Sequence, residues 1–212
     1  MEKFRHIPDV HRRIFAAMLA NLDDGIGTVL ATLRDTGIER DTLVVFLSDN
    51  GGATRELTSS NAPLRGEKGQ VFEGGIRVPF ILRWPAQFPG GRVVDTPAIS
   101  LDVTATALAA AGATVEGSGQ DGIDLMPLLT TNEALEKPRT FYWRAGPRAA
   151  LRQGDWKIVR DGARGRLRQW QLFNLATDVA ETTDLAAQDL ERLTTLVALW
   201  EKWSATQAEP AW

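Results

Sequence analysis

The chain is 212 residues long, with 43% hydrophobic and 24% charged residues, a formal net charge of -3 and no cysteine. This length suffices for one or two domains with a substantial hydrophobic core. The slightly acidic balance disfavours a globally basic nucleic-acid binder, and the lack of cysteine excludes disulfides, Cys-ligated zinc, iron–sulfur clusters and a thiol nucleophile.

The sequence predicts neither a targeting segment nor a membrane span. Met1 is followed by a charged stretch, and the longest uncharged run, residues 103–115, is rich in Ala and Thr. That run is shorter than the roughly 20 apolar residues of a spanning helix. We therefore expect a soluble chain without a signal peptide that contacts no membrane; the sequence does not distinguish periplasm from cytoplasm.

The first half of the chain alternates helical and strand patterns. Residues 9–36 carry apolar side chains at helical spacing and predict a long helix, and residues 100–111 predict a short one. Residues 42–47 and 78–84 are apolar runs typical of strands buried on both faces. Residues 53–77, between these strands, have no clear period and predict a long functional loop. This succession indicates an α/β fold.

The second half carries shorter patterns, from which we predict a small antiparallel sheet with one helix laid across it. The predicted strands, separated by Gly and Asp turns, are residues 140–143, 149–152, 156–160 and 170–175. Residues 185–204 predict the helix, with Leu190, Leu196 and Trp200 on its apolar face. We therefore divide the chain into two domains, residues 1–125 and residues 126–212.

The first candidate site follows the first predicted strand. Asp49 and Asn50 lie in the polar turn of residues 48–52, directly after the apolar run. Open α/β sheets place ligand sites at the carboxyl ends of their strands. A carboxylate beside an amide carbonyl offers hard oxygen ligands, which suit Ca²⁺ or Mg²⁺ better than zinc. Asp-Asn-Gly is also ordinary turn chemistry, so a metal site and a plain turn both fit these residues.

Two glycine-containing segments follow in the predicted loop. Residues 64–69 read Leu-Arg-Gly-Glu-Lys-Gly, in which glycines allow close backbone approach to a ligand and Lys68 either meets an anion or lies in solvent. Residues 73–79 read Glu-Gly-Gly-Ile-Arg-Val-Pro and lead into the second strand. There, Glu73 and Arg77 either brace the loop or contact substrate.

Together, residues 48–52, 64–69 and 73–79 resemble the downstream half of the type I sulfatases of the alkaline-phosphatase superfamily. The resemblance continues upstream and downstream of these segments. The further residues that match the family pattern are 13–18, 22–27, 121–122, 152–158, 172–175, Asp178 and Glu181. It implies an incomplete alkaline-phosphatase-like mixed sheet with helices, which is the C-terminal part of the sulfatase catalytic domain. A small α+β domain, an antiparallel sheet plus a C-terminal helix, follows it.

The resemblance also implies roles for individual residues. Asp49 and Asn50 match the family's downstream pair of ligands to a divalent cation, usually Ca²⁺, with Mg²⁺ as the alternative. Lys68 matches a lysine that contacts the sulfate and the nucleophile, and Glu73 and Arg77 match loop-shaping positions. The chemistry is consistent, because a sulfate ester that develops negative charge is stabilised by a fixed cation and a lysine.

The chain departs from the family pattern at the nucleophile. In sulfatases this is a formylglycine made from Cys or Ser in a Cys/Ser-x-Pro/Ala-x-Arg motif, and no residue of this chain fits that motif. The family's upstream pair of metal-binding Asp residues is also missing. His6, in His-Ile-Pro, only superficially resembles a sulfate-contacting histidine, and a surface histidine is the simpler reading. We therefore expect the isolated chain to be inactive.

Three functional readings remain open at this point. The complete enzyme hydrolyses sulfate esters, of aryl or carbohydrate type, or it is a phosphonate or phosphate ester hydrolase of the same superfamily. In the third reading the chain is a non-catalytic remnant or a docking half, whose partner is the missing upstream half or a second copy. That reading predicts exposed sheet edges, which promote association. No nucleic-acid partner is expected.

Overall fold

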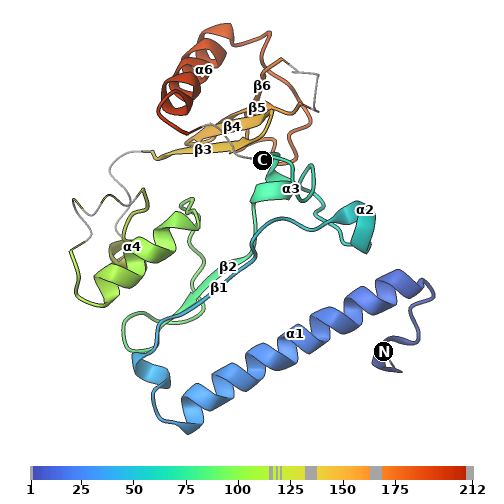
Figure 1. Cartoon of the computed structure of the whole chain (residues 1–212), viewed down its shortest axis with the longest axis vertical. Coiled ribbons are helices and arrows are strands. Elements are labelled where there is room, and N and C mark those ends of the chain that lie inside the picture. Colours follow the sequence, from blue (N-terminus) through green and yellow to red (C-terminus); the bar gives the residue numbers. More distant parts are fainter. Residues whose placement is uncertain are drawn as a thin grey trace. The chain divides into compact units, whose positions relative to one another are not determined.

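The structure is a computed structural model that describes residues 2–114, 117, 119, 121–131, 138–162 and 169–208 (Figure 1). Its residues form two compact units, each made of discontinuous segments. The first unit comprises Met1–Ala17, Ser48–Val78 and Pro138–Trp212; the second comprises Met18–Leu47 and Pro79–Lys137. The two-domain division at residue 125 remains a prediction from the sequence.

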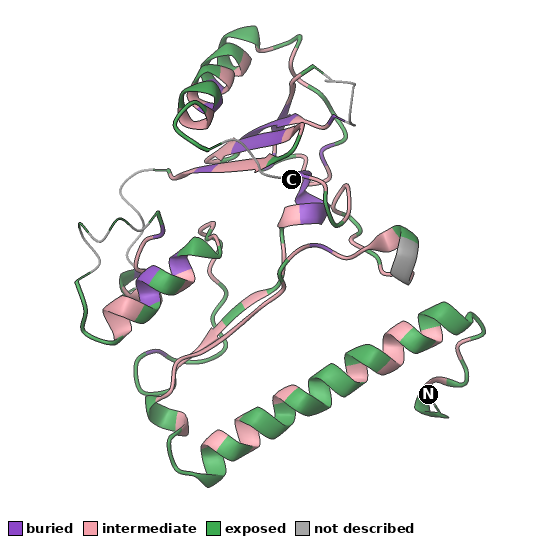
Figure 2. Cartoon of the chain, viewed as in Figure 1, coloured by how far each residue is buried: buried purple, intermediate pink, exposed green. Residues whose placement is uncertain are grey.

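The predicted N-terminal helix is confirmed. After a short 3-10 turn at Glu2–Phe4, α1 runs over Val10–Asp35, and a second 3-10 turn follows at Glu39–Asp41. None of the α1 residues is buried, as its green and pink ribbon in Figure 2 shows. Among the described residues, α1 is long and apolar enough to cross a membrane by length and composition, a property that the sequence analysis did not assign to it.

A two-stranded antiparallel sheet forms the centre of the second unit. It consists of β1 (Val44–Leu47) and β2 (Phe80–Arg83), with Val44 opposite Arg83 and Leu47 opposite Phe80. The strands were predicted correctly, but their burial on both faces was predicted wrongly: β1 is half-buried and Ile81 is 57% exposed. Within the described residues the two strands pair only with each other, and no residue of either strand is buried, so neither face of the sheet is covered as the apolar runs led us to expect.

Two helices complete the second unit. They are α4 (Leu101–Ala110), which confirms the predicted short helix, and α5 (Met126–Thr130). The buried Asp102 carboxylate accepts hydrogen bonds from the amides of Ile99 (2.9 Å) and Ile123 (3.0 Å). A buried polar group needs such partners, and these bonds fold the chain after α4 back onto the helix.

The predicted C-terminal sheet is confirmed in the first unit. Its strands are β3 (Thr140–Ala145), β4 (Arg148–Gln153), β5 (Trp156–Arg160) and β6 (Gln171–Asn174), paired antiparallel in that order. The helix that accompanies it is α6 (Leu190–Ser204).

Both faces of this sheet are covered, because successive side chains of a strand point to opposite faces. On one face Leu151, Ile158 and Leu172 pack with Leu196 and Trp200 of α6. On the other face lies a second apolar cluster, made of Val71, Phe72, Ala150, Val159, Phe173 and Leu175. The segment that contains the predicted site residues therefore packs against the sheet, opposite α6.

The helix α6 begins later than predicted, at Leu190 instead of residue 185. The Asp184 carboxylate accepts a hydrogen bond from the Leu172 amide, and the Leu185 amide donates to the Leu172 carbonyl, so this stretch pairs with β6 before the helix starts. Asp189 then caps α6 by accepting from the Arg192 amide at 3.0 Å.

Candidate functional site

The turn after β1 holds the two predicted metal ligands. Asp49 is exposed and Asn50 is half-buried. The Ser48 hydroxyl donates to the Asn50 carbonyl at 2.8 Å, and the Gly51 amide donates to the Gly75 carbonyl at 2.9 Å. The turn is thereby fixed both within itself and to α3 (Glu73–Ile76).

The contact between this turn and α3 depends on glycine. A Cβ atom on Gly51 would lie 1.8 Å from the Gly74 carbonyl oxygen, and one on Gly75 would lie 2.1 Å from the Gln70 carbonyl oxygen. No side chain fits at either position without moving the backbone. The glycines of the two motifs therefore bring three backbone segments into direct contact.

Lys68 lies on the neighbouring loop and is exposed. Its amide donates to the Gly52 carbonyl at 3.3 Å. The Asn61 side chain reinforces this junction, because its Nδ2 donates to the carbonyls of Gly52 (2.9 Å) and Gly66 (3.1 Å) and its Oδ1 accepts from the Gly52 amide (3.0 Å). The loop of Lys68 and the turn of Asp49 are thus joined through Gly52.

The charged groups of Asp49 and Lys68 have no hydrogen-bond or ion-pair partner within the described part of the chain. In contrast, Glu67, next to Lys68, is fully engaged: it accepts from the Thr54 hydroxyl at 2.6 Å and pairs with Arg55 at 2.8 Å, both from α2 (Thr54–Leu57). The Thr54 hydroxyl is the main cause of a lowered pKa of Glu67. Sequence reasoning assigned these two unpartnered side chains to a cation and to a sulfate.

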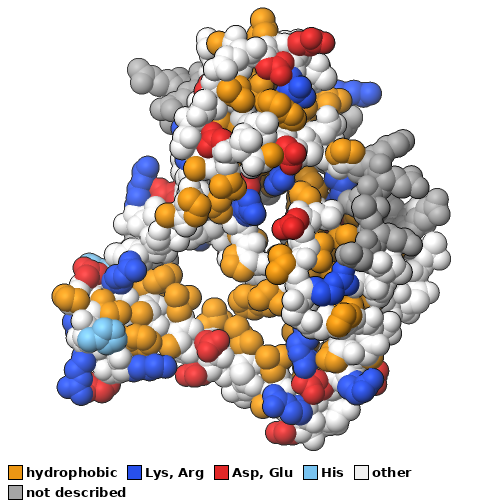
Figure 3. All heavy atoms as spheres, turned by 180° about the vertical axis from the view of Figure 1, so that it is seen from behind, with side chains coloured by type: hydrophobic (Ala, Val, Ile, Leu, Met, Phe, Trp, Pro, Cys, Tyr) orange, Lys and Arg blue, Asp and Glu red, His pale blue; other side chains and the backbone are white. Residues whose placement is uncertain are grey.

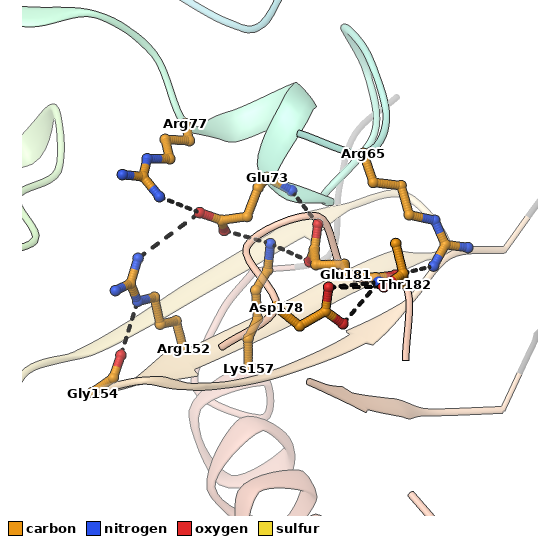
Figure 4. Close-up of polar contacts among 9 residues, drawn as sticks. All are labelled: Arg65, Glu73, Arg77, Arg152, Gly154, Lys157, Asp178, Glu181 and Thr182. Carbon is orange, nitrogen blue, oxygen red and sulfur yellow. Dashed lines mark hydrogen bonds and ion pairs between the residues drawn. The ribbon is translucent and has the colours of Figure 1, made fainter. Parts of the chain in front are cut away.

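Glu73 is buried, whereas Arg77 is exposed. Figure 4 shows the contacts that both side chains make. The Glu73 Oε1 atom lies 2.8 Å from Lys157 Nζ on β5. Its Oε2 atom lies 3.9 Å from the guanidinium groups of both Arg77 and Arg152. Glu73 therefore connects α3 to the C-terminal sheet, and Arg77 lies at the outer side of that connection.

Glu181 completes the buried network. It is fully buried; its Oε1 lies 2.9 Å from Lys157 Nζ, and its Oε2 accepts from the Glu73 amide at 2.6 Å. Burial raises the pKa of Glu181, although the Lys157 charge and the Glu73 amide counteract this. The loop that contains Glu181 is held by the Asp178 carboxylate, which accepts hydrogen bonds from the amides of Thr182 and Thr183.

Sequence reasoning quoted Lys157 and Glu181 as part of a family pattern but gave them no role. One signal was available for Lys157: it stands between Trp156 and Ile158 in the middle of an apolar strand, where burial is expected on either face. A lysine at such a position needs a carboxylate partner. The partner is not evident from the sequence, because Glu73 is 84 residues away.

The described residues contain no group of three or more His, Cys, Asp and Glu side chains that would hold a metal ion. Asp49 and Asn50 supply two hard oxygen ligands, whereas Ca²⁺ takes six to eight. Their donor type thus fits Ca²⁺ or Mg²⁺, and their number fits part of a site. His6 is exposed and is separated from Asp49 by more than 40 residues in the sequence. The neighbouring Ile7 carbonyl accepts a hydrogen bond from the Arg13 guanidinium at 2.9 Å.

The surface charge is mixed in sign. On the face drawn in Figure 3, Lys and Arg side chains are interspersed with Asp and Glu. A nucleic-acid groove requires a continuous basic stripe along the phosphate backbone. Residues 137–168 hold ten Lys and Arg residues, and this basic stretch lies partly outside the described residues.

Known proteins resemble this chain in sequence. A family model described as Sulfatase matches residues 6–113. Steryl-sulfatase of Mus musculus is 46% identical over 116 residues, which are 51% of this chain and 19% of that protein. Arylsulfatase A of Homo sapiens is 34% identical over 150 residues, which are 68% of this chain and 29% of that protein.

The fold is also found in a solved structure. The crystal structure of Ps i-CgsB in complex with k-i-k-neocarrahexaose matches with a TM-score of 0.88 and 33% identity, covering 100% of this chain and 47% of that one. This chain therefore spans about half of that protein and less than a third of the two curated relatives. The match includes both the loop with the predicted ligands and the C-terminal sheet.

Proposed function

This chain belongs to the sulfatase family, and from that premise we propose that it carries the downstream part of the reaction site of a sulfate ester hydrolase. The family resemblance and the α/β fold class predicted from the sequence are confirmed. One observation supports the proposal most: the Asp49 turn and the Lys68 loop are joined at Gly52, while the charges of both side chains have no partner within the described residues.

In this proposal Asp49 and Asn50 hold half of a Ca²⁺ site, with Mg²⁺ as the alternative ion. The bound cation would supply positive charge opposite the sulfate oxygens. Lys68 donates hydrogen bonds to the same sulfate group and stabilises the negative charge that develops there. Glu73 and Arg77 shape the loop, a role that the burial of Glu73 supports. The nucleophile, a formylglycine in the family, is not supplied by any residue of this chain.

A sulfated saccharide is the substrate class we favour. The solved relative with 33% identity is in complex with k-i-k-neocarrahexaose, and its match covers the whole of this chain. Aryl sulfates and phosphate or phosphonate esters remain the alternatives, since the same platform of cation and lysine serves each of them. Parallel assays on a carbohydrate sulfate, an aryl sulfate and a phosphate monoester separate these substrate classes.

Cation binding tests the first half of the proposal. Calorimetric titration of the chain with Ca²⁺ should give weak binding, on the order of millimolar, because two protein ligands are far fewer than a full Ca²⁺ site provides. Asp49→Ala should abolish the binding, whereas Asp95→Ala, which removes an exposed carboxylate in the second unit, should leave it unchanged. Equal loss in both variants would contradict a site at Asp49.

We further propose that the isolated chain does not turn over substrate, because a half metal site and one lysine do not replace a nucleophile. Incubation with an aryl sulfate and Ca²⁺ should release no product above the buffer rate. Turnover that disappears in Lys68→Ala would overturn this proposal and make the chain a catalyst in its own right.

The unburied helix α1 favours a docking role in addition. It exposes Val10, Ile14, Met18, Leu22 and Val29, a stripe at helical spacing that a soluble fold normally covers. The Sulfatase match at residues 6–113 includes this helix, which supports α1 as a domain helix instead of a signal sequence or membrane span. We therefore propose that further sulfatase polypeptide, from the same or another chain, packs on α1.

Complementation tests the docking role. The portion of Ps i-CgsB that this chain does not match would be co-expressed with it and the mixture purified by size exclusion. Co-elution, together with sulfate ester hydrolysis that is lost in Lys68→Ala, is the expected result. Co-elution that survives a charged substitution at Met18 would show that α1 is not the docking surface.

A further inference from the structure

We propose that Lys157 and Glu181 are positioning residues for the site on residues 48–78. Through Glu73 and Arg65 they hold the Asp49 turn and the Lys68 loop in the arrangement that binds cation and sulfate. The inference rests on the proposed function and extends it to two residues of the C-terminal sheet region.

The first step in the argument is burial. Lys157 and Glu181 have no exposed side-chain surface, and the Glu73 side chain is 3% exposed. Two carboxylates share one ammonium group at 2.8 and 2.9 Å, as the dashed lines in Figure 4 show. A buried ion network of this kind is weak evidence for stability as such, because desolvation offsets the attraction. Its geometry is nevertheless tightly defined, since a displaced partner leaves an unpaired buried charge.

The second step is where the network attaches. The Glu181 carbonyl accepts from Arg65 Nη1 at 2.8 Å, and its carboxylate accepts from the Glu73 amide at 2.6 Å. These two contacts lie at the two ends of residues 65–73, the segment that carries Lys68. Glu181 itself is held at φ 54, in the left-handed region that non-glycine residues rarely adopt. Both ends of the Lys68 loop are therefore clamped by one residue.

The third step connects the clamp to the predicted metal ligands. Glu73 is the first residue of α3, and two residues later the Gly75 carbonyl accepts the Gly51 amide at 2.9 Å. Gly51 directly follows Asn50, and a Cβ on it would collide with Gly74. A movement of α3 relative to the C-terminal sheet would therefore move the Asp49 turn, because Gly51 is in direct backbone contact with Gly74 and Gly75.

The fourth step distinguishes the contacts that attach the Lys68 segment to the sheet from those that orient it. Val71 and Phe72 already attach the segment to the sheet through apolar contacts with Val159 and Phe173. Apolar contacts have no directional preference, whereas hydrogen-bonded ion pairs fix distance and orientation. The apolar contacts therefore attach the segment to the sheet, and the ion network fixes its orientation there.

Native-state hydrogen exchange followed by NMR tests the proposal on the whole chain. Lys157→Met should speed exchange of the Gly51, Lys68 and Gly75 amides at least tenfold relative to the Ile158 and Val159 amides. Lys157→Arg, which keeps the charge, should restore part of the protection. Leu196→Ala is the matched control, because it weakens the opposite face of the same sheet; it should affect α6 and sheet amides more than these three.

Two results would overturn the proposal. One is uniform acceleration in Lys157→Met, equal to that in Leu196→Ala; the other is unchanged exchange at the three amides. If Lys157→Met does not fold, the same comparison with the same criteria is made on Glu181→Gln. This variant replaces one carboxylate oxygen by an amide group and removes the charge.

Ca²⁺ titration of the same variants adds a readout that simple stability does not move. The apparent Kd should rise at least fivefold in Lys157→Met and recover in Lys157→Arg. An unchanged Kd in Lys157→Met would overturn the positioning role. If the unaltered chain binds no Ca²⁺, the proposed function fails at its metal site, and the exchange comparison alone decides whether Lys157 and Glu181 hold the loop.

Discussion

Lys157 occupies a position in β5 that the apolar pattern would assign to a hydrophobic side chain. Its removal would leave the carboxylates of Glu73 and Glu181 buried without their cation, a change that typically costs about 3–5 kcal/mol. Sequence reasoning predicted Asp49, Asn50 and Lys68 from local motifs, and their roles stay predictions. It missed the Lys157 network because the partners are distant in sequence, and no local spacing brings them together.

Gly51 provides a first test at the scale of single residues. Gly51→Ala would place a methyl group against the Gly74 carbonyl, so we expect destabilisation of about 1–3 kcal/mol or more. Gly27→Ala is the control: nothing lies within 4 Å of its Cβ position in α1, and the change should be neutral or stabilising by about 0.5–1 kcal/mol. Urea denaturation of both variants measures the difference. Equal effects would contradict the tight backbone contact at Gly51.

Glu181 provides a second test, through pH. Burial raises its pKa above the ordinary value of 4.5, so the folded state binds this proton more tightly than the unfolded state. Its contribution to stability is therefore fully present below pH 4.5 and decreases as the pH rises through the folded pKa. Glu181→Gln removes the titration, and its stability should vary less with pH above 4.5.

The measurement is the urea midpoint of both proteins at several pH values from 4 to about 8. The pKa of Asp178 shifts in the opposite direction, and Asp178 is present in both proteins. Burial raises its pKa, but the amides of Thr183 and Thr182 outweigh this effect and lower the pKa below 3.8. Its contribution is lost only as the pH falls through that lower value. Parallel curves for the two proteins above pH 4.5 would contradict a raised pKa of Glu181.

At the scale of elements, local patterns predicted α1, α4 and the four strands of the C-terminal sheet, because alternation and helical spacing arise within each segment. The burial of β1 and β2 was predicted wrongly, since it depends on layers that other segments must supply. The start of α6 was also predicted wrongly. Asp184 pairs the preceding stretch with β6, and that contact is not visible in a helical pattern.

The apolar face of α6 is the basis of a third prediction. Leu196 is 3% exposed and packs with the sheet, so Leu196→Ala should cost about 2–5 kcal/mol. Leu190 was predicted on the same face but is 66% exposed at the start of the helix. Leu190→Ala should therefore stay within about 0.5 kcal/mol, measured by urea denaturation. A comparable loss in both variants would mean that the helix packs over its full predicted length.

At the scale of the whole molecule, the exposed stripe on α1 leads to a fourth prediction. The isolated chain should self-associate with rising concentration, because a large apolar surface is left uncovered. Met18 is 61% exposed on this stripe, and Met18→Glu should shift the chain toward monomer in size-exclusion chromatography with light scattering. Gly27→Glu adds the same charge at an exposed position of α1 outside the stripe, where nothing lies near its Cβ position. A shift of equal size in both variants would point to net charge instead of the apolar stripe.

The discontinuous first unit has a consequence for the timing of synthesis. Glu73 and Glu181 are 108 residues apart, and the whole of Pro79–Lys137 is made between the loop and the strands that anchor it. At about 5–20 residues per second, the ribosome needs roughly 5–20 s to cover that distance. During this interval the Asp49 turn and the Lys68 loop exist without their clamp. The proposed cation and sulfate site therefore assembles only after β5 and Glu181 have been made, so a nascent chain stopped before β5 would lack it.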